Sequence, residues 1–195
     1  MIKYTDTKEF FSTPVFTYEV DTSLIREELM KKLPTIGRLS KTDTTWNQGL
    51  SSEVYYTNFG TPTTISSFEG VLKELKSSLA GSGLYFEAGA YWVAAYRQGA
   101  GHELHIHKDN LLGFGNFSGI LHMSNIGKTV FITNSPSSSS NQEELESAEG
   151  LLSLFPATLP HSVPSHGVTE EWRYIIAFNA AIYNQEEMRD YGLDI

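Results

Sequence analysis

The chain has 195 residues, of which 40% are hydrophobic and 12% aromatic, so it can bury one sizeable core. Its net charge of -9, without any stripe of clustered lysines and arginines, argues against a nucleic-acid-binding protein, because phosphate contacts need such clusters. The absence of cysteine excludes disulfides, thiolate metal sites and cysteine nucleophiles.

The N-terminal part of the chain shows no targeting signal. The opening residues, MIKYTDTKEF, lack the apolar stretch of a secretory signal, and no later run reaches the ~20 apolar residues of a membrane span. We therefore expect a soluble, cytoplasmic protein that does not insert into a membrane.

Residues 14–20 alternate like a strand, and Asp21 or Ser23 can cap a following helix that Pro34 would end at about Lys32.

A second helix is predicted to start at Ser66 or Ser67 and to end at Gly81. Five apolar residues recur in it at helical spacing, which predicts one face packed on a sheet. These residues are Phe68, Val71, Leu72, Leu75 and Leu79.

From Leu84 onward the chain is a series of strand-like segments separated by Gly, Ser, Asn and Pro. Six or more strands after two helices predict a mainly β fold, a jelly roll with the helices packed outside. We expect one domain, with N-terminal support in residues 1–83, a jelly-roll core in 84–183 and a tail in 184–195. Residues 135–150 (SPSSSSNQEELESAEG) are polar and of low complexity, which favours a surface insertion between two strands.

Metal-ligating side chains gather in the segment HELHIHKD. On a strand, His105, His107 and Asp109 would share one face, because successive side chains alternate. His161 follows an apolar strand and a proline turn, and is the best further ligand. Two histidines and a carboxylate, taken as His107, His161 and Asp109, occupy one face of an octahedron and leave three positions open, as in non-haem Fe(II) oxygenases.

Arg173 lies in an apolar and aromatic strand twelve residues after His161. A buried guanidinium there is costly without an anionic partner. A dicarboxylate cosubstrate could chelate the metal at one end and pair with Arg173 at the other. The residues Arg173, Ile175, Ala177 and Asn179 share the face expected to line the pocket.

The order of these residues resembles the signature of the 2-oxoglutarate/Fe(II)-dependent oxygenases, in particular their prolyl-4-hydroxylase-like branch and related oxygenases of phages and bacteria. HKDN, SGILHMSN, LFPATLPHSV and WRYIIAFN carry the resemblance, which spans residues 91–183. It implies a double-stranded β-helix, the metal triad His107, Asp109 and His161, Arg173 as cosubstrate anchor, and Fe(II), 2-oxoglutarate and O2 as cofactor and cosubstrates. Succinate and CO2 would be the coproducts, and a retained Asp109 favours hydroxylation over halogenation.

Two positions depart from the family pattern. Family members often have Arg-x-Ser in the last strand, whereas Ile175 stands here in place of the serine. Tyr91, Tyr96 or His122 is expected to complete the carboxylate site, and we assign Tyr96 and His122 with Arg173 to cosubstrate binding. The second departure is the extra His105, which we interpret as a pocket-lining residue, with ligation left as the alternative.

The expected function is hydroxylation of an amino acid, a peptidyl residue or a small metabolite. One alternative is a cupin-like metal enzyme with His105, His107 and His161 as ligands and no need for 2-oxoglutarate. The other is a non-catalytic β-sandwich binding module, which would bind no iron. His166 lies in a turn-like stretch and is expected to be solvated.

Overall fold

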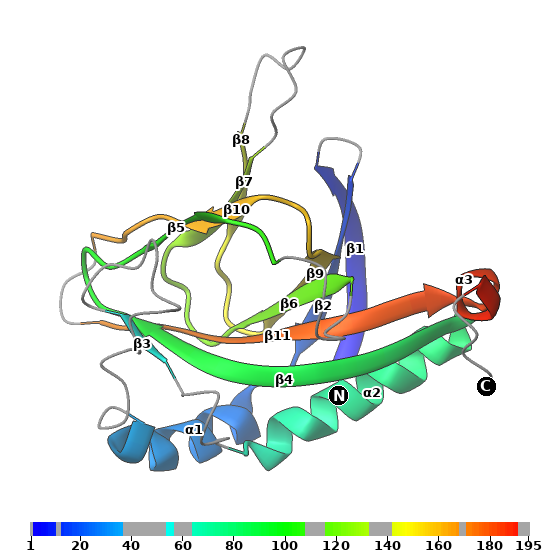
Figure 1. Ribbon diagram of the computed structural model, residues 1–195. Coiled ribbons are helices and arrows are strands. Elements are labelled where there is room, and N and C mark those ends of the chain that lie inside the picture. Colours follow the sequence, from blue (N-terminus) through cyan, green and yellow to red (C-terminus); the bar gives the residue numbers. More distant parts are fainter. Residues whose placement is uncertain are drawn as a thin grey trace.

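The computed structural model describes residues 2–10, 13–36, 54–56, 64–107, 116–132, 142–167 and 171–190. Within them, a larger and a smaller antiparallel sheet lie face to face (Figure 1). The larger sheet has the strand order β1 (Ile2–Phe10), β2 (Thr13–Val20), β9 (Leu151–Pro156), β6 (Phe117–His122), β11 (Arg173–Asn184), β4 (Leu84–Tyr96) and β3 (Val54–Tyr56). The smaller sheet has the order β5 (His102–His105), β10 (His161–Val163), β7 (Lys128–Ile132) and β8 (Gln142–Glu146).

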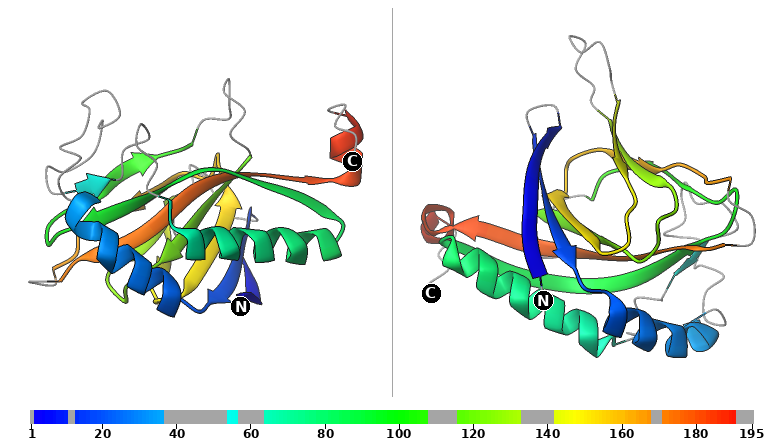
Figure 2. Two further views of the ribbon diagram at one scale, coloured as in Figure 1. Left: turned by 90° about the horizontal axis from the view of Figure 1, so that it is seen from below. Right: turned by 180° about the vertical axis from the view of Figure 1, so that it is seen from behind.

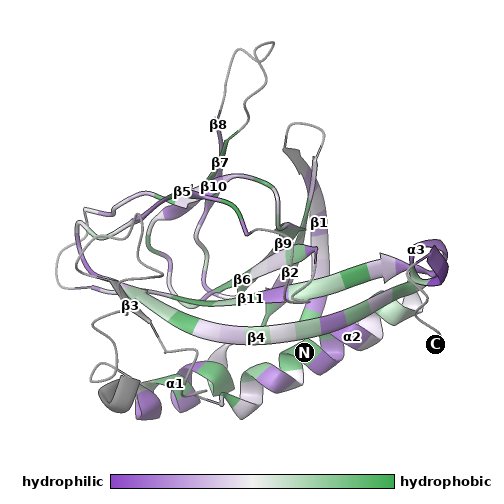
Figure 3. Cartoon of the chain, viewed as in Figure 1, coloured by the Kyte–Doolittle hydropathy of each residue, from purple (hydrophilic) through white to green (hydrophobic). Residues whose placement is uncertain are grey.

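The helices α1 (Ser23–Ile36) and α2 (Ser66–Gly81) cover the outer face of the larger sheet (Figures 1 and 2). On α2, Phe68, Val71, Leu75 and Leu79 are buried, and Leu72 packs against the same cluster. The predicted apolar stripe is therefore confirmed as a core face. Along both helices hydrophilic and hydrophobic stretches alternate, as expected when one side faces solvent (Figure 3).

The larger sheet separates two apolar cores. Ile176 and Phe178 of β11 belong to the core under the helices, whereas Ile175 and Ala177 belong to the core between the sheets. This alternation is the period of two expected of a strand buried on both faces. The predicted pocket face of β11 is thus the face that points into the roll.

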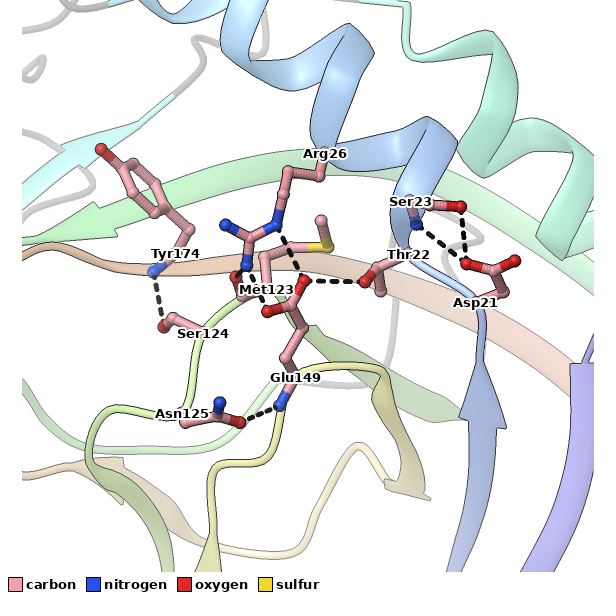
Figure 4. Close-up of polar contacts among 9 residues, drawn as sticks. All are labelled: Asp21, Thr22, Ser23, Arg26, Met123, Ser124, Asn125, Glu149 and Tyr174. Atoms are coloured by element: carbon pink, nitrogen blue, oxygen red, sulfur yellow. Dashed lines mark hydrogen bonds and ion pairs between the residues drawn. The ribbon is translucent and has the colours of Figure 1, made fainter.

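A polar network holds the start of α1 against the sheet (Figure 4). Arg26 donates from Nε to Glu149 at 2.8 Å and also forms an ion pair with that carboxylate through Nη2. Thr22 Oγ1 donates to Glu149 Oε1 at 2.9 Å, and Asn125 Oδ1 accepts from the Glu149 N–H at 2.6 Å. Glu149 lies just before β9, so the network joins the first helix to the turn that leads into the roll.

Three details differ from the sequence-based predictions. Helix α1 runs to Ile36, so Pro34 does not end it. Strand β5 ends at His105, which leaves His107 beyond the strand. The polar segment 135–150 is not wholly an insertion, because its residues Gln142–Glu146 form β8, pair with β7 and bury Leu145.

The mainly β jelly roll with external helices is confirmed. A short helix, α3 (Gln185–Asp190), follows β11 in the predicted tail. In the part of the chain that the structure describes, the helices are too short or too polar to cross a membrane.

Candidate metal centre

Three histidines from one end of the smaller sheet converge inside the roll. Strands β5 and β10 pair antiparallel with His161 opposite His105, and His107 follows two residues after β5. One ligating nitrogen from each of the three lies within 4.8 Å of the other two. The ring centroids are 4.2 Å apart for His105 and His161, and 5.2 Å apart for His107 and His161.

Hydrogen bonds at Nδ1 fix the orientation of each ring. His161 Nδ1 lies 2.9 Å from the Leu159 carbonyl oxygen, and His105 Nδ1 lies 2.8 Å from that of Glu103. A carbonyl oxygen only accepts, so Nδ1 carries the proton in both rings and Nε2 keeps its lone pair. His107 Nδ1 likewise donates to the amide oxygen Oδ1 of Asn179 at 3.0 Å. Such outer contacts are the usual support of metal-ligating histidines.

Burial keeps these imidazoles neutral at pH 7. Desolvation lowers the pKa of His107 to about 4 and that of His161 well below its usual value, and the neighbouring His105 adds to both effects. Burial likewise lowers the pKa of His105. Neutral imidazole is the form that binds a metal, so the group is ready to accept a cation.

The histidines border a cavity of about 40 Å³ between the sheets. That volume has room for about three water-sized groups. The Trp92 and His107 rings lie nearly parallel, with centroids 6.2 Å apart, and the His102 ring stacks on His105 at 3.8 Å. The cavity is also lined by Tyr96, Ser118, Gly119, Ile120, Phe155, Val163, Ile175, Ala177 and Phe178.

Arg173, at the start of β11, is a buried charge with incomplete hydrogen bonding. Only 1% of its surface is exposed. Nη1 donates to the Lys128 carbonyl at 3.0 Å and Nη2 to Thr129 Oγ1 at 3.4 Å, while Nε has no partner among the described residues. Its guanidinium carbon lies 5.6 Å from the ring centroid of Tyr96, which also lines the cavity. No carboxylate of the described residues forms an ion pair with it.

His122 lies on β6, next to β11, opposite Ile175. It is fully buried, and both ring nitrogens lack a hydrogen-bond partner among the described residues. Burial and the nearby Arg173 lower its pKa to about 3, so the ring is neutral. A buried imidazole without a partner for either nitrogen among the described residues is unusual, and both nitrogens are available to a polar ligand. A carboxylate beside Arg173 has the charge and the acceptor atoms that this pair lacks.

The structure sorts the predicted site residues into three groups. His105, His107 and His161 meet at the cavity, and Tyr96, His122 and Arg173 lie together beside it. Asp109, the predicted carboxylate ligand, lies outside the described residues.

Two other predictions need correction. The Tyr91 hydroxyl accepts the Ile65 N–H at 2.6 Å, and its ring packs on Phe68 under the helices, away from Arg173. His166 is 7% exposed and not solvated, because its Nε2 lies 3.2 Å from the Tyr96 carbonyl oxygen inside the fold.

One supporting residue was missed by the sequence analysis. Asn179, which orients His107, had been placed on the pocket face of β11, and its amide on that face was the available signal.

Comparison with known proteins finds similarity only at the level of structure. No protein-family model and no curated protein matches the sequence. A Pseudomonas putida prolyl-4-hydroxylase superposes with a TM-score of 0.60 at 15% identity, over 88% of this chain and 94% of that one. A prolyl hydroxylase from Trichoplax adhaerens, in complex with a hypoxia inducible factor peptide fragment, gives 0.59 at 15% identity, over 91% and 86%.

HygX from Streptomyces hygroscopicus, with nickel, 2-oxoglutarate and hygromycin B bound, gives a TM-score of 0.58 at 12% identity, over 88% of this chain and 84% of that one. At such identities the likeness shows the fold alone. The chain therefore has the jelly-roll fold of the 2-oxoglutarate/Fe(II) oxygenases, as the sequence resemblance implied.

Proposed function

We propose that this protein is a dioxygenase that depends on Fe(II) and 2-oxoglutarate and hydroxylates a C–H bond of an amino acid, a peptidyl residue or a small metabolite. The observation that carries the proposal is the buried Arg173. Its Nε–H and both nitrogens of the adjacent His122 lack partners among the described residues, in the same roll that holds three neutral histidines. A non-catalytic sandwich would have no use for either feature.

The metal would be held by His107 and His161, with Asp109 as the carboxylate ligand. The Nε2 lone pairs of the two histidines fit that role, because their Nδ1 protons are already engaged. Bound Fe(II), together with 2-oxoglutarate and O2, would supply the oxidising chemistry and release succinate and CO2. Asn179 and the Leu159 carbonyl keep the two rings aimed at one point.

Arg173 would anchor the distal carboxylate of 2-oxoglutarate. Its guanidinium offers the Nε–H for a charge-assisted hydrogen bond, and the buried surroundings strengthen that bond. His122 and Tyr96 lie beside it and would complete the carboxylate site in place of the serine that this chain lacks. Thr129 Oγ1, already an acceptor from Arg173, holds the guanidinium in position.

The remaining walls exclude water and shape the substrate space. Phe155, Ile175 and Ala177 give the cavity an apolar side, while Trp92 and His102 line it beside the metal ligands. Two of the structurally similar proteins are a prolyl hydroxylase in complex with a peptide fragment and HygX with hygromycin B bound, which supports a small or peptidyl substrate here. We place this activity in the cytoplasm, on a substrate other than nucleic acid.

The test is iron-dependent conversion of 2-oxoglutarate to succinate, measured by mass spectrometry with a panel of free amino acids and peptides. Turnover is expected to need Fe(II), O2 and 2-oxoglutarate, and to be lost in His161→Ala. Iron-loaded protein that gives no succinate with any member of the panel would count against the proposal.

A second candidate is the three-histidine metal enzyme that needs no 2-oxoglutarate. It is favoured by the grouping of His105 with His107 and His161. It gives no role to the buried Arg173, whose Nε–H has no partner among the described residues, so we rank it second. Binding of 2-oxoglutarate to the metal-loaded protein separates the two candidates.

A further inference from the structure

His105 lies as close to the proposed metal position as the two family-type histidines do. Its ring centroid is 4.2 Å from that of His161 and 5.3 Å from that of His107. The second of these distances matches the 5.2 Å between His107 and His161 themselves. By position alone, nothing separates His105 from the other two.

The ring of His105 is also oriented like a ligand. Its Nδ1 donates to the Glu103 carbonyl oxygen of its own strand, so Nε2 is the nitrogen with the lone pair. The ring of His102 stacks on the other side at 3.8 Å with an interplanar angle of 19°, which limits the movement of His105.

The distances suit a shared ion after small adjustments. Metal–nitrogen bonds of ~2.1 Å place two ligand atoms ~3 Å apart when they are neighbours on the ion and ~4.2 Å apart when they are opposite. The three histidine nitrogens lie within 4.8 Å of one another. Side-chain rotations that move each nitrogen by up to ~1 Å would bring such pairs to the ~3 Å of neighbouring ligands, and three histidines are a sufficient protein ligand set in known catalytic metal sites.

We propose that His105 is a direct metal ligand beside His107 and His161, so that this chain holds its metal through three histidines with or without Asp109. The inference rests on the proposed function for the identity of the metal, but it concerns a residue that the His-x-Asp pattern leaves out. Three neutral imidazoles leave the full charge on a divalent ion, which increases its attraction for an anionic cosubstrate.

The experiment measures the binding of Co(II) alone, by isothermal titration and by the visible ligand-field spectrum. Asp109→Ala is expected to retain one Co(II) per chain. Adding His105→Ala to that variant is expected to weaken binding by more than ~100-fold, because loss of a direct ligand exceeds the ~10- to 100-fold effect of an outer contact. His102→Ala, which removes only the stacked neighbour, is the matched control and is expected to stay within that smaller range.

Two results would overturn the inference. One is equal Co(II) affinity and an unchanged spectrum in Asp109→Ala with and without the His105 substitution. The other is complete loss of Co(II) from Asp109→Ala while His105 is intact. Circular dichroism verifies folding, and His105→Gln replaces the alanine variant if that variant does not fold.

Failure of the proposed function has a different signature. In that case wild-type protein binds Co(II) normally but does not bind 2-oxoglutarate. The Co(II) titration of Asp109→Ala with and without His105→Ala still decides whether His105 is a ligand.

Discussion

Replacing Arg173 with methionine separates an anchoring role from a structural one. Arg173 is 1% exposed, and its Nε–H has no partner among the described residues. If it pairs with the distal carboxylate of 2-oxoglutarate, the variant leaves that carboxylate desolvated and unpaired. Losing one partner of such a pair costs ~3–5 kcal/mol. The dissociation constant for 2-oxoglutarate should therefore rise ~100- to 5,000-fold.

The assay is isothermal titration of 2-oxoglutarate into Co(II)-loaded protein, with metal affinity measured separately. Metal affinity is expected to stay within a few-fold of wild type, because Arg173 contributes no metal ligand. The melting temperature of the cosubstrate-free variant is expected not to fall, since methionine removes a buried charge and keeps most of the volume. A structural role would give the opposite pattern. Unchanged 2-oxoglutarate affinity together with a lower melting temperature would refute the anchoring role.

Three further predictions concern the scaffold. The first prediction concerns Glu28. Burial alone would raise the pKa of this carboxyl, but hydrogen bonds from Lys32 and from the start of α2 outweigh that effect and lower the pKa to about 2. After solvent screening the stabilisation is on the order of 1 kcal/mol; it is present above pH ~4.5 and lost as pH falls toward 2. Glu28→Gln should flatten acid unfolding over that range, and equal acid profiles would contradict this. Gly119→Ala should destabilise by ~1–3 kcal/mol in urea unfolding, since its Cβ would lie 2.1 Å from the Phe178 ring, and an unaltered midpoint would contradict that contact. Glu149→Gln should lower the melting temperature by only ~1–4 °C, because the pair with α1 is partly exposed.

The helices and strands whose apolar residues recur at a regular spacing were predictable from the sequence. The stripe from Phe68 to Leu79 predicted α2, and the alternation after Arg173 predicted which face of β11 lines the pocket. Both follow from fixed geometric periods, which local sequence expresses directly. The order of His107, His161 and Arg173 along the chain was likewise enough to expect that they meet inside one roll.

Features that depend on distant partners were not predictable. Strand β1 is polar and mostly exposed, so it shows no apolar pattern, and its pairing with β2 decides its structure. Strand β8 buries only Leu145 and is hidden in a polar stretch. Pro34 resembles a helix end in sequence but lies within α1.

The environments of the site histidines also come from tertiary contacts. His122 lies beside Arg173 because β6 pairs with β11, and neither of its ring nitrogens has a partner within the described segments. His105 faces His161 because β5 pairs with β10. Spacing along the chain placed His105 on the right face of a strand. It could not show that the side chain lies as near His161 as His107 does.

The central claim is that the histidine cluster and Arg173 bind opposite ends of one 2-oxoglutarate molecule. Anaerobic titration of wild-type protein with 2-oxoglutarate, with and without Fe(II), tests it directly. The prediction is one 2-oxoglutarate per chain in the iron-loaded protein, accompanied by a visible charge-transfer band from chelation, and far weaker binding without iron. Iron-loaded protein that binds no 2-oxoglutarate, or binds it equally well without iron, would contradict the claim.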